Sequence, residues 1–165
     1  MAAVSRGGGQ RSVLRFGVMT VTRGTDMPYK LTWLVENRVL YVRYFGVFTR
    51  EDLENSLAES VAMRDQANVV NGDDGPLVHT VSDVLRMEGQ TVGLTDAQQT
   101  LRALRGQRAG WSVYVSDNRA QRFMSAVGHQ LAGMRFRSFN NLPAALAFLQ
   151  EADPTLPALK PPPEL

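Results

Sequence analysis

Hydrophobic positions follow one another most densely at residues 39–57, where an apolar run passes directly into a helical pattern. The run carries one charge, Arg43, and is otherwise rich in β-branched and aromatic side chains. This composition predicts a strand that is buried on both faces inside an α/β sheet. Thr49 and Asp52 then form a capping box, which predicts a helix that begins directly after Thr49.

Strand and helix periods alternate along most of the chain. Alternating or continuous apolar runs predict strands at residues 29–36, 39–47, 77–84, 111–115 and 134–139. Capped runs with helical spacing predict helices near residues 50–66, 95–105, 117–132 and 142–152. This order implies a mostly parallel sheet with right-handed crossovers. We therefore expect an α/β fold with a mixed five-stranded sheet, an N-terminal β-hairpin and about four helices.

Local signals place the turns and the faces of the first helix. Asn37 tolerates the positive φ angle of a hairpin turn, and residues 71–75 and 86–93 are expected to be loops. An apolar stripe of the first helix is expected to face the core, and it consists of Leu53, Leu57 and Val61. The side expected to face solvent carries Glu51, Glu54, Glu59 and Arg64.

The last two helices have similar signals. Ser116 or Asp117 is expected to cap the third helix, and Asn141 is expected to cap the fourth, with Pro143 in its first turn. The inner face of the third helix is expected to hold Phe123, Val127 and Leu131. The inner face of the fourth is expected to hold Leu142, Ala145, Leu146 and Leu149.

Length, composition and charge add the domain organisation. With 165 residues and 44% apolar side chains, the chain is expected to form one domain at residues 27–152. Residues 1–26 form an arginine- and glycine-rich leader that is expected to be flexible, and residues 153–165 form a proline-rich tail. The leader contributes +3 to a net charge of +2. The domain therefore has no large positive field, and we do not expect nucleic-acid binding.

Two absences narrow the class of protein further. The sequence contains no cysteine, which excludes disulfides, thiolate metal sites and thiol nucleophiles. No apolar run reaches the roughly 18 residues that a membrane span needs, and the N-terminus lacks the apolar region of a secretory signal. We expect a cytoplasmic protein without a membrane span.

Three stretches of the chain carry a resemblance to a known family. They read LTWLVENRVLYVRYFGVFT, LVHTVSD, and GWSVYVSDNRAQRF through RFRSFNNLPAALAFLQEADPTLP, and the first contains the turn Gly46-Val47-Phe48-Thr49. In these stretches the chain resembles the STAS domain, the SpoIIAA-like fold of bacterial anti-sigma-factor antagonists. The resemblance covers nearly all of residues 28–157 and extends to a set of uncharacterised small bacterial proteins. It implies a regulatory, non-enzymatic module that docks a partner protein.

The resemblance also points to a phosphorylation site, which this sequence lacks. The antagonists are switched by phosphorylation of a Ser or Thr just after the third strand. Asp83 matches the aspartate at that strand end, but Val84 follows it and has no hydroxyl. Ser82 precedes Asp83 and, by alternation, points to the opposite face. We expect no phospho-switch.

The carboxyl ends of the predicted strands offer candidates for binding a ligand or a partner, because ligands of open α/β sheets bind there. The candidates are Ser82, Asp83, Ser116, Asp117, Asn118, Arg119 and Arg122. The last five residues open a helix, whose free N–H groups favour an anion. Helix capping beside a solvated arginine face explains the same five without a ligand. The alternative for Asp83 is a carboxylate that accepts backbone N–H groups of the following loop.

Signatures of enzymes and metal sites are absent from the sequence. There is no nucleophile elbow, dinucleotide loop or phosphate loop, and no spacing arranges a nucleophile with a base. His79 and His129 are expected to be hydrogen-bonded packing residues rather than metal ligands. We expect neither an enzyme nor a metal or other cofactor.

Two functions from different classes remain open. The first is a regulatory or protein-interaction module of the STAS-like type, without the phospho-switch. The alternative is a protein that binds a small apolar or anionic metabolite in the crevice at the strand ends. Self-association into a homo-oligomer is compatible with both, because the hairpin leaves a strand edge.

Overall fold

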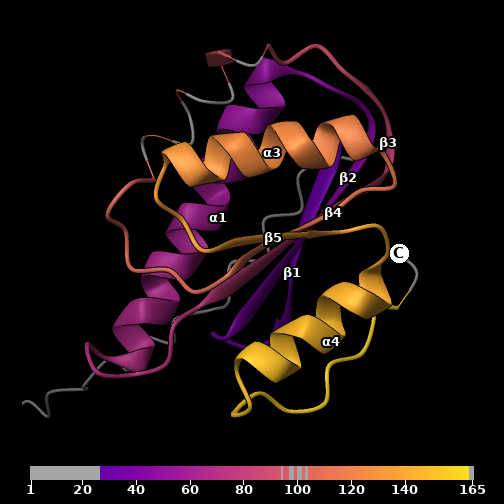
Figure 1. The fold of residues 1–165 in the computed structure, drawn as a ribbon. Helices are drawn as coiled ribbons and strands as arrows, with labels where there is room; N and C mark the ends of the chain where they lie inside the picture. Colours follow the sequence, from indigo (N-terminus) through magenta and orange to yellow (C-terminus); the bar gives the residue numbers. More distant parts are fainter. Residues whose placement is uncertain (1–26, 94, 97–98, 100–101, 103, 164–165) are drawn as a thin grey trace, which may run out of the picture.

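The computed structural model describes residues 27–93, 95–96, 99, 102 and 104–163, which form one sheet flanked by helices (Figure 1). The strands are β1 (Tyr29–Val35), β2 (Val39–Phe48), β3 (His79–Gln90), β4 (Ser112–Val115) and β5 (Phe136–Phe139). The helices are α1 (Arg50–Asn71), α3 (Arg119–Leu131) and α4 (Leu142–Ala152). The helix predicted near residues 95–105 lies partly outside the described ranges, which omit residues 97–98, 100–101 and 103.

The topology of the sheet is the predicted one. Its strands lie in the order β1-β2-β3-β4-β5, with β1 antiparallel to β2 and all other neighbours parallel. Asn37 has the positive φ angle expected in the hairpin turn, at 57°. The expected α/β class, with a mixed and mostly parallel five-stranded sheet, is confirmed.

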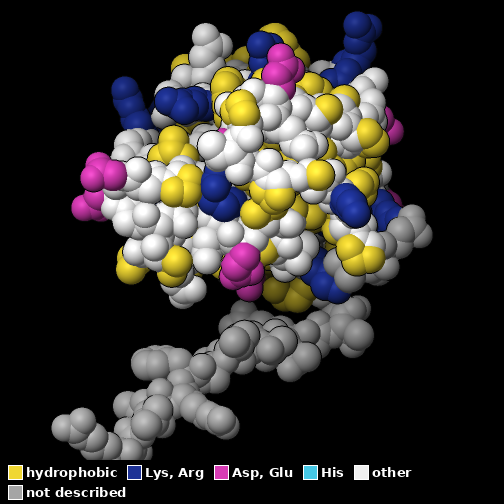
Figure 2. Space-filling view, turned by 90° about the horizontal axis from the view of Figure 1, so that it is seen from below, with side chains coloured by type: hydrophobic (Ala, Val, Ile, Leu, Met, Phe, Trp, Pro, Cys, Tyr) yellow, Lys and Arg dark blue, Asp and Glu magenta, His cyan; other side chains and the backbone are white. Residues whose placement is uncertain are grey.

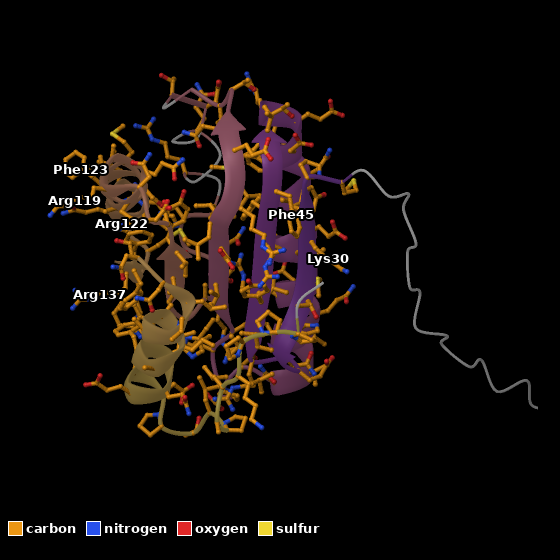
Figure 3. The ribbon with its side chains drawn as sticks, turned by 90° about the vertical axis from the view of Figure 1, so that its right-hand side faces the viewer. Lys30, Phe45, Arg119, Arg122, Phe123 and Arg137 are labelled. Atoms are coloured by element: carbon orange, nitrogen blue, oxygen red, sulfur yellow. The ribbon has the colours of Figure 1, made fainter. Side chains whose placement is uncertain are left out.

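Strand β2 is buried on both faces, as its composition predicts. Val39 and Tyr41 face the side covered by α4, whereas Leu40 and Val42 face the side covered by α1. Figure 3 shows α4 in front of the sheet and α1 behind it. The helix α4 also has the predicted cap, Asn141, and its four predicted inner residues are all buried. The sheet therefore separates two apolar layers, one under α4 and one under α1.

Strand β3 differs from the prediction because it continues to Gln90. The hydrophobic pattern predicts that the strand ends at residue 84 and that residues 86–93 form a loop, which is wrong for residues 86–90. The long partner β2 provides the reason, since Gly46 pairs with Met87 and Phe48 with Gln90. Two register shifts in this pairing break the strict alternation that sequence reading depends on. Helix α1 likewise extends to Asn71, beyond its predicted end.

Helix α3 corrects two predictions. Its cap is Asn118, not Ser116 or Asp117, because the Asn118 side chain accepts hydrogen bonds from the backbone N–H groups of Ala120 and Gln121. Two residues predicted for its inner face are exposed, Phe123 at 68% and Leu131 at 53%. The buried positions of α3 are instead Gly128 and His129, and the ring of His129 stacks on Phe136 of β5 with centroids 4.2 Å apart.

Helix α1 is also rotated relative to the prediction. Its buried stripe consists of Ser56, Ser60, Arg64 and Ala67. Arg64, predicted to face solvent, is only 5% exposed. The serine hydroxyls bond to carbonyls of their own helix, Ser60 to Ser56 at 2.7 Å. Leu53, Leu57 and Val61, predicted to face the core, are half-buried.

The proline-rich tail has no regular structure in its described part, but it contacts the domain. Leu156 is buried in the apolar layer under α4, and Leu159 packs against that layer. Asp153 bonds to Arg38 at 2.8 Å and to His79 at 3.1 Å, which ties the end of α4 to the starts of β2 and β3. None of the helices in the described ranges has the length and apolar character that a bilayer span requires.

Candidate functional site

A cavity of about 370 Å³ lies between the sheet and helices α1 and α3, and it opens to solvent. Its walls are mostly aliphatic, aromatic or methionine side chains, among them Val42, Phe48, Leu53, Val61, Met87 and Tyr114. The half-buried apolar residues of α1, Leu53, Leu57 and Val61, line this cavity, and Leu53 also packs against the core cluster on this face of the sheet. Packed interiors leave few voids larger than a water molecule. A cavity of this size is thus a feature that packing alone does not explain.

Polar groups interrupt this apolar lining at a few positions. Burial raises the pKa of the Tyr44 hydroxyl, and the nearby side chains of Ser56 and Ser82 oppose that rise without cancelling it. Burial also raises the pKa of Tyr114, so both phenols stay neutral at ordinary pH. Ser82, a candidate from the sequence, lies in the cavity wall. An apolar pocket with a few placed polar groups is the usual form of a small-molecule site.

Ser112 and His129 form a second polar element of the wall. The backbone carbonyl of Ser125 lies 2.8 Å from His129 Nδ1, and a carbonyl only accepts, so this nitrogen carries the proton. Nε2 then accepts from the Ser112 hydroxyl at 3.0 Å. Burial lowers the pKa of His129, so the ring is neutral. The sequence analysis found no nucleophile beside a base, and this pair, 17 residues apart, is one that only the fold assembles.

A serine–histidine pair is only one part of an acyl-transfer site. Such catalysis needs N–H donors aimed at the developing oxyanion. The N–H of Ser112 donates instead to the Arg135 carbonyl, at 2.8 Å. Ser112 also sits in β4, between β3 and β5, where ladder hydrogen bonds use the backbone. The Ser112 hydroxyl and the Ser125 carbonyl together hold the orientation of the His129 ring.

Asp83 lies on the other face of the sheet, away from Ser82 and the cavity. It accepts a hydrogen bond from the Tyr41 hydroxyl and lies 3.5 Å from Arg43 Nε, which itself donates to the Tyr41 oxygen at 2.8 Å. It also accepts from the backbone N–H of Leu85 at 3.0 Å, as the alternative reading predicted. Leu85 belongs to β3 itself rather than to a following loop. All three side chains of the cluster are buried, so Asp83 is a structural carboxylate.

The remaining candidates lie together at the start of α3. Ser116 is buried and donates to Gln121 at 2.7 Å, while Asn118 occupies two N–H groups of the helix terminus. Arg122 folds back onto the carbonyl of Ser116. Arg119 and Asp117 are exposed, and Figure 3 shows Arg119 pointing away from the sheet. The backbone N–H groups of Ala120 and Gln121 and the guanidinium of Arg122, which could bind an anion here, thus already donate hydrogen bonds to groups of the protein itself.

The seven predicted residues therefore divide among three places, and the sequence analysis missed most of the cavity. Ser82 belongs to the cavity, Asp83 to the cluster beneath the opposite face, and the other five to the start of α3. One signal was present in the sequence: Ser56, Ser60 and Arg64 repeat every four residues. Such a stripe of small and polar residues indicates a helix face that does not pack in an ordinary apolar core.

Neither a charged patch on the face shown in Figure 2 nor a cluster of metal-binding side chains in the described part of the chain marks this site. On the face shown in Figure 2, basic, acidic and hydrophobic side chains are interspersed rather than gathered into one charged area. Within the described ranges, no three His, Asp or Glu side chains come together as a metal site would require. The site is defined by its apolar cavity.

Comparison with known proteins gives a match at the level of the fold. No protein-family model matches the chain, and no curated protein matches it either. Among solved structures, an uncharacterised protein of the DUF3478 family from Shewanella loihica PV-4, described as having a SpoIIAA-like fold, superposes with a TM-score of 0.50. The match covers 73% of this chain and 91% of that one, at 14% sequence identity. This chain has a SpoIIAA-like fold. The resemblance seen in the sequence is thereby confirmed for the fold, which does not carry an activity with it.

Proposed function

We propose that this SpoIIAA-like chain is a non-enzymatic binding module that takes up a small, mostly apolar molecule between its sheet and helices α1 and α3. The observation that carries the proposal is the apolar cavity of about 370 Å³. Ligand cavities of proteins have volumes of about 300–1,000 Å³ and walls of this kind. The site extends along one face of the sheet, so it is wider than the crevice at the strand ends that the sequence suggested.

Binding of an uncharged fluorescent probe, N-phenyl-1-naphthylamine, tests the proposal directly. We expect its emission to rise when it enters the cavity of the full-length protein. Thr80 lines the cavity, and the substitution Thr80→Phe fills part of it. The variant is expected to bind the probe at least tenfold more weakly. Thr91→Phe, at an exposed position outside the lining, serves as the matched control. Equal probe binding by wild type and Thr80→Phe would contradict the proposal.

A regulatory role through a protein partner is the second candidate, and one surface favours it. Phe123 and Leu131 are exposed on α3, and Arg119 and Arg137 project from the same side of the molecule in Figure 3. Exposed apolar groups with arginines beside them suit a partner that presents an acidic rim around an apolar anchor. The substitution Phe123→Ser is expected to abolish retention of one specific protein while leaving probe binding unchanged. Identical sets of retained proteins with and without Phe123 would count against this role.

A further inference from the structure

Arg64 places a buried positive charge in the wall of the cavity. The residue is 5% exposed and belongs to the lining. Its Nη2 donates to the side-chain oxygen of Gln107. Its Nε is buried and has no hydrogen-bond partner in the part of the chain that the structure describes. Buried polar groups in folded proteins are nearly always hydrogen-bonded, so an unpaired guanidinium nitrogen beside a cavity requires an explanation.

Two other arginines have a buried unpaired nitrogen, but their charge is balanced. Arg38 pairs with Asp153 at 2.8 Å, and Arg43 pairs with Asp83 at 3.5 Å. For Arg64, no carboxylate of the described residues lies within 4.0 Å. Burial lowers the pKa of Arg64, with Asp65 opposing this, yet a guanidinium stays protonated in proteins. Among the described residues, the positive charge of Arg64 in the cavity wall therefore has no ion-pair partner.

A buried charge without a partner is costly, and a ligand can supply the partner. An anion in the cavity would accept a hydrogen bond from the guanidinium of Arg64 and neutralise it in a site of low dielectric constant. One positive charge balances one negative charge, which favours a carboxylate over a doubly charged phosphate. The apolar remainder of the cavity, with Leu53, Leu57 and Val61 on the same helix, accommodates a hydrocarbon chain.

We infer that the ligand is an amphipathic monocarboxylate, whose carboxylate pairs with the guanidinium of Arg64 and whose hydrocarbon chain fills the apolar cavity. This inference rests on the proposed function, because it assigns the chemical class of the molecule that the cavity binds. Each methylene that enters the cavity is expected to strengthen binding about fourfold until the space is filled.

Competition between the naphthylamine probe and two ligands of equal chain length, decanoate and 1-decanol, tests the assignment. We expect wild-type protein to prefer decanoate by roughly 10- to 100-fold, the usual gain from a hydrogen bond to a charged group. In Arg64→Met, which keeps much of the apolar stem and removes the charge, the preference for decanoate over 1-decanol is expected to vanish. Arg105→Met removes an exposed arginine outside the lining and is expected to behave as wild type.

The outcomes separate the two proposals. If the probe fails to bind wild type, the proposed function and this inference both fall. If the probe binds but decanoate and 1-decanol compete equally, or if folded Arg64→Met keeps the preference, only the carboxylate assignment is overturned. Circular dichroism checks the fold of each variant. Should Arg64→Met not fold, the comparison of the two ligands on wild type still decides the question.

Discussion

Removing the charge of Asp83 is expected to destabilise the protein by about 3–5 kcal/mol, because it leaves a buried arginine without its partner. Asp83 is 3% exposed, Arg43 is 7% exposed and Tyr41 is fully buried. In Asp83→Asn the shape is kept, but the Arg43 guanidinium loses its counter-charge, and one of its nitrogens, Nη1, is already unpaired. The expected loss corresponds to roughly 6–20 °C in melting temperature for a chain of this size.

A double-mutant cycle measured by urea unfolding isolates this effect. Arg43→Met combined with Asp83→Asn removes both charges, and the pair of apolar and neutral side chains is expected to recover a large part of the lost stability. A coupling free energy of about 2 kcal/mol or more is expected. The cluster lies on the face away from the cavity, so probe binding by the folded variants is expected to match wild type. A loss below about 1 kcal/mol for Asp83→Asn, as in exposed ion pairs, would refute the reasoning.

Three further predictions concern the packing and titration of the domain. A β-carbon at Gly110 would lie 2.6 Å from Nδ1 of His79, so Gly110→Ala is expected to lower the free energy of unfolding by about 1–3 kcal/mol. Gly89 has open space around it, so Gly89→Ala is expected to be nearly neutral when both variants are compared by thermal melting. Leu149→Ala, at a fully buried position, is expected to cost about 2–5 kcal/mol in urea unfolding, and Leu131→Ala, at a half-exposed one, less than about 0.5 kcal/mol. Burial lowers the pKa of both histidines, His79 and His129, below 6.5. Below that pH the unfolded chain therefore binds more protons than the folded chain does. The free energy of unfolding is expected to fall on acidification from pH 6.5 by up to about 1.4 kcal/mol per pH unit for each histidine. Melting temperatures that stay constant from pH 7 to pH 5 would contradict this last prediction.

The sequence alone determined the fold class and the order of the elements, because the signals for both are local. Apolar periodicity identified every strand of the sheet, and the capping box at Thr49 and the cap at Asn141 fixed the starts of α1 and α4. Asn37 likewise marked the hairpin. Each signal depends only on neighbours within a turn or two of backbone, so no knowledge of distant contacts was needed.

Only the tertiary structure decided which helix faces are buried and where the cavity lies. Arg64, predicted to face solvent, is buried, whereas Phe123, predicted to be buried, is exposed. The buried face of α1 contains Ser56 and Ser60, and that of α3 contains Gly128 and His129, so neither helix buries its predicted apolar stripe. The pairing of Ser112 with His129 and of Asp83 with Tyr41 joins residues far apart in the chain. Periodicity can say that a helix has two faces, but which face meets the sheet is set by close packing between elements, and this packing leaves the cavity that Arg64 borders.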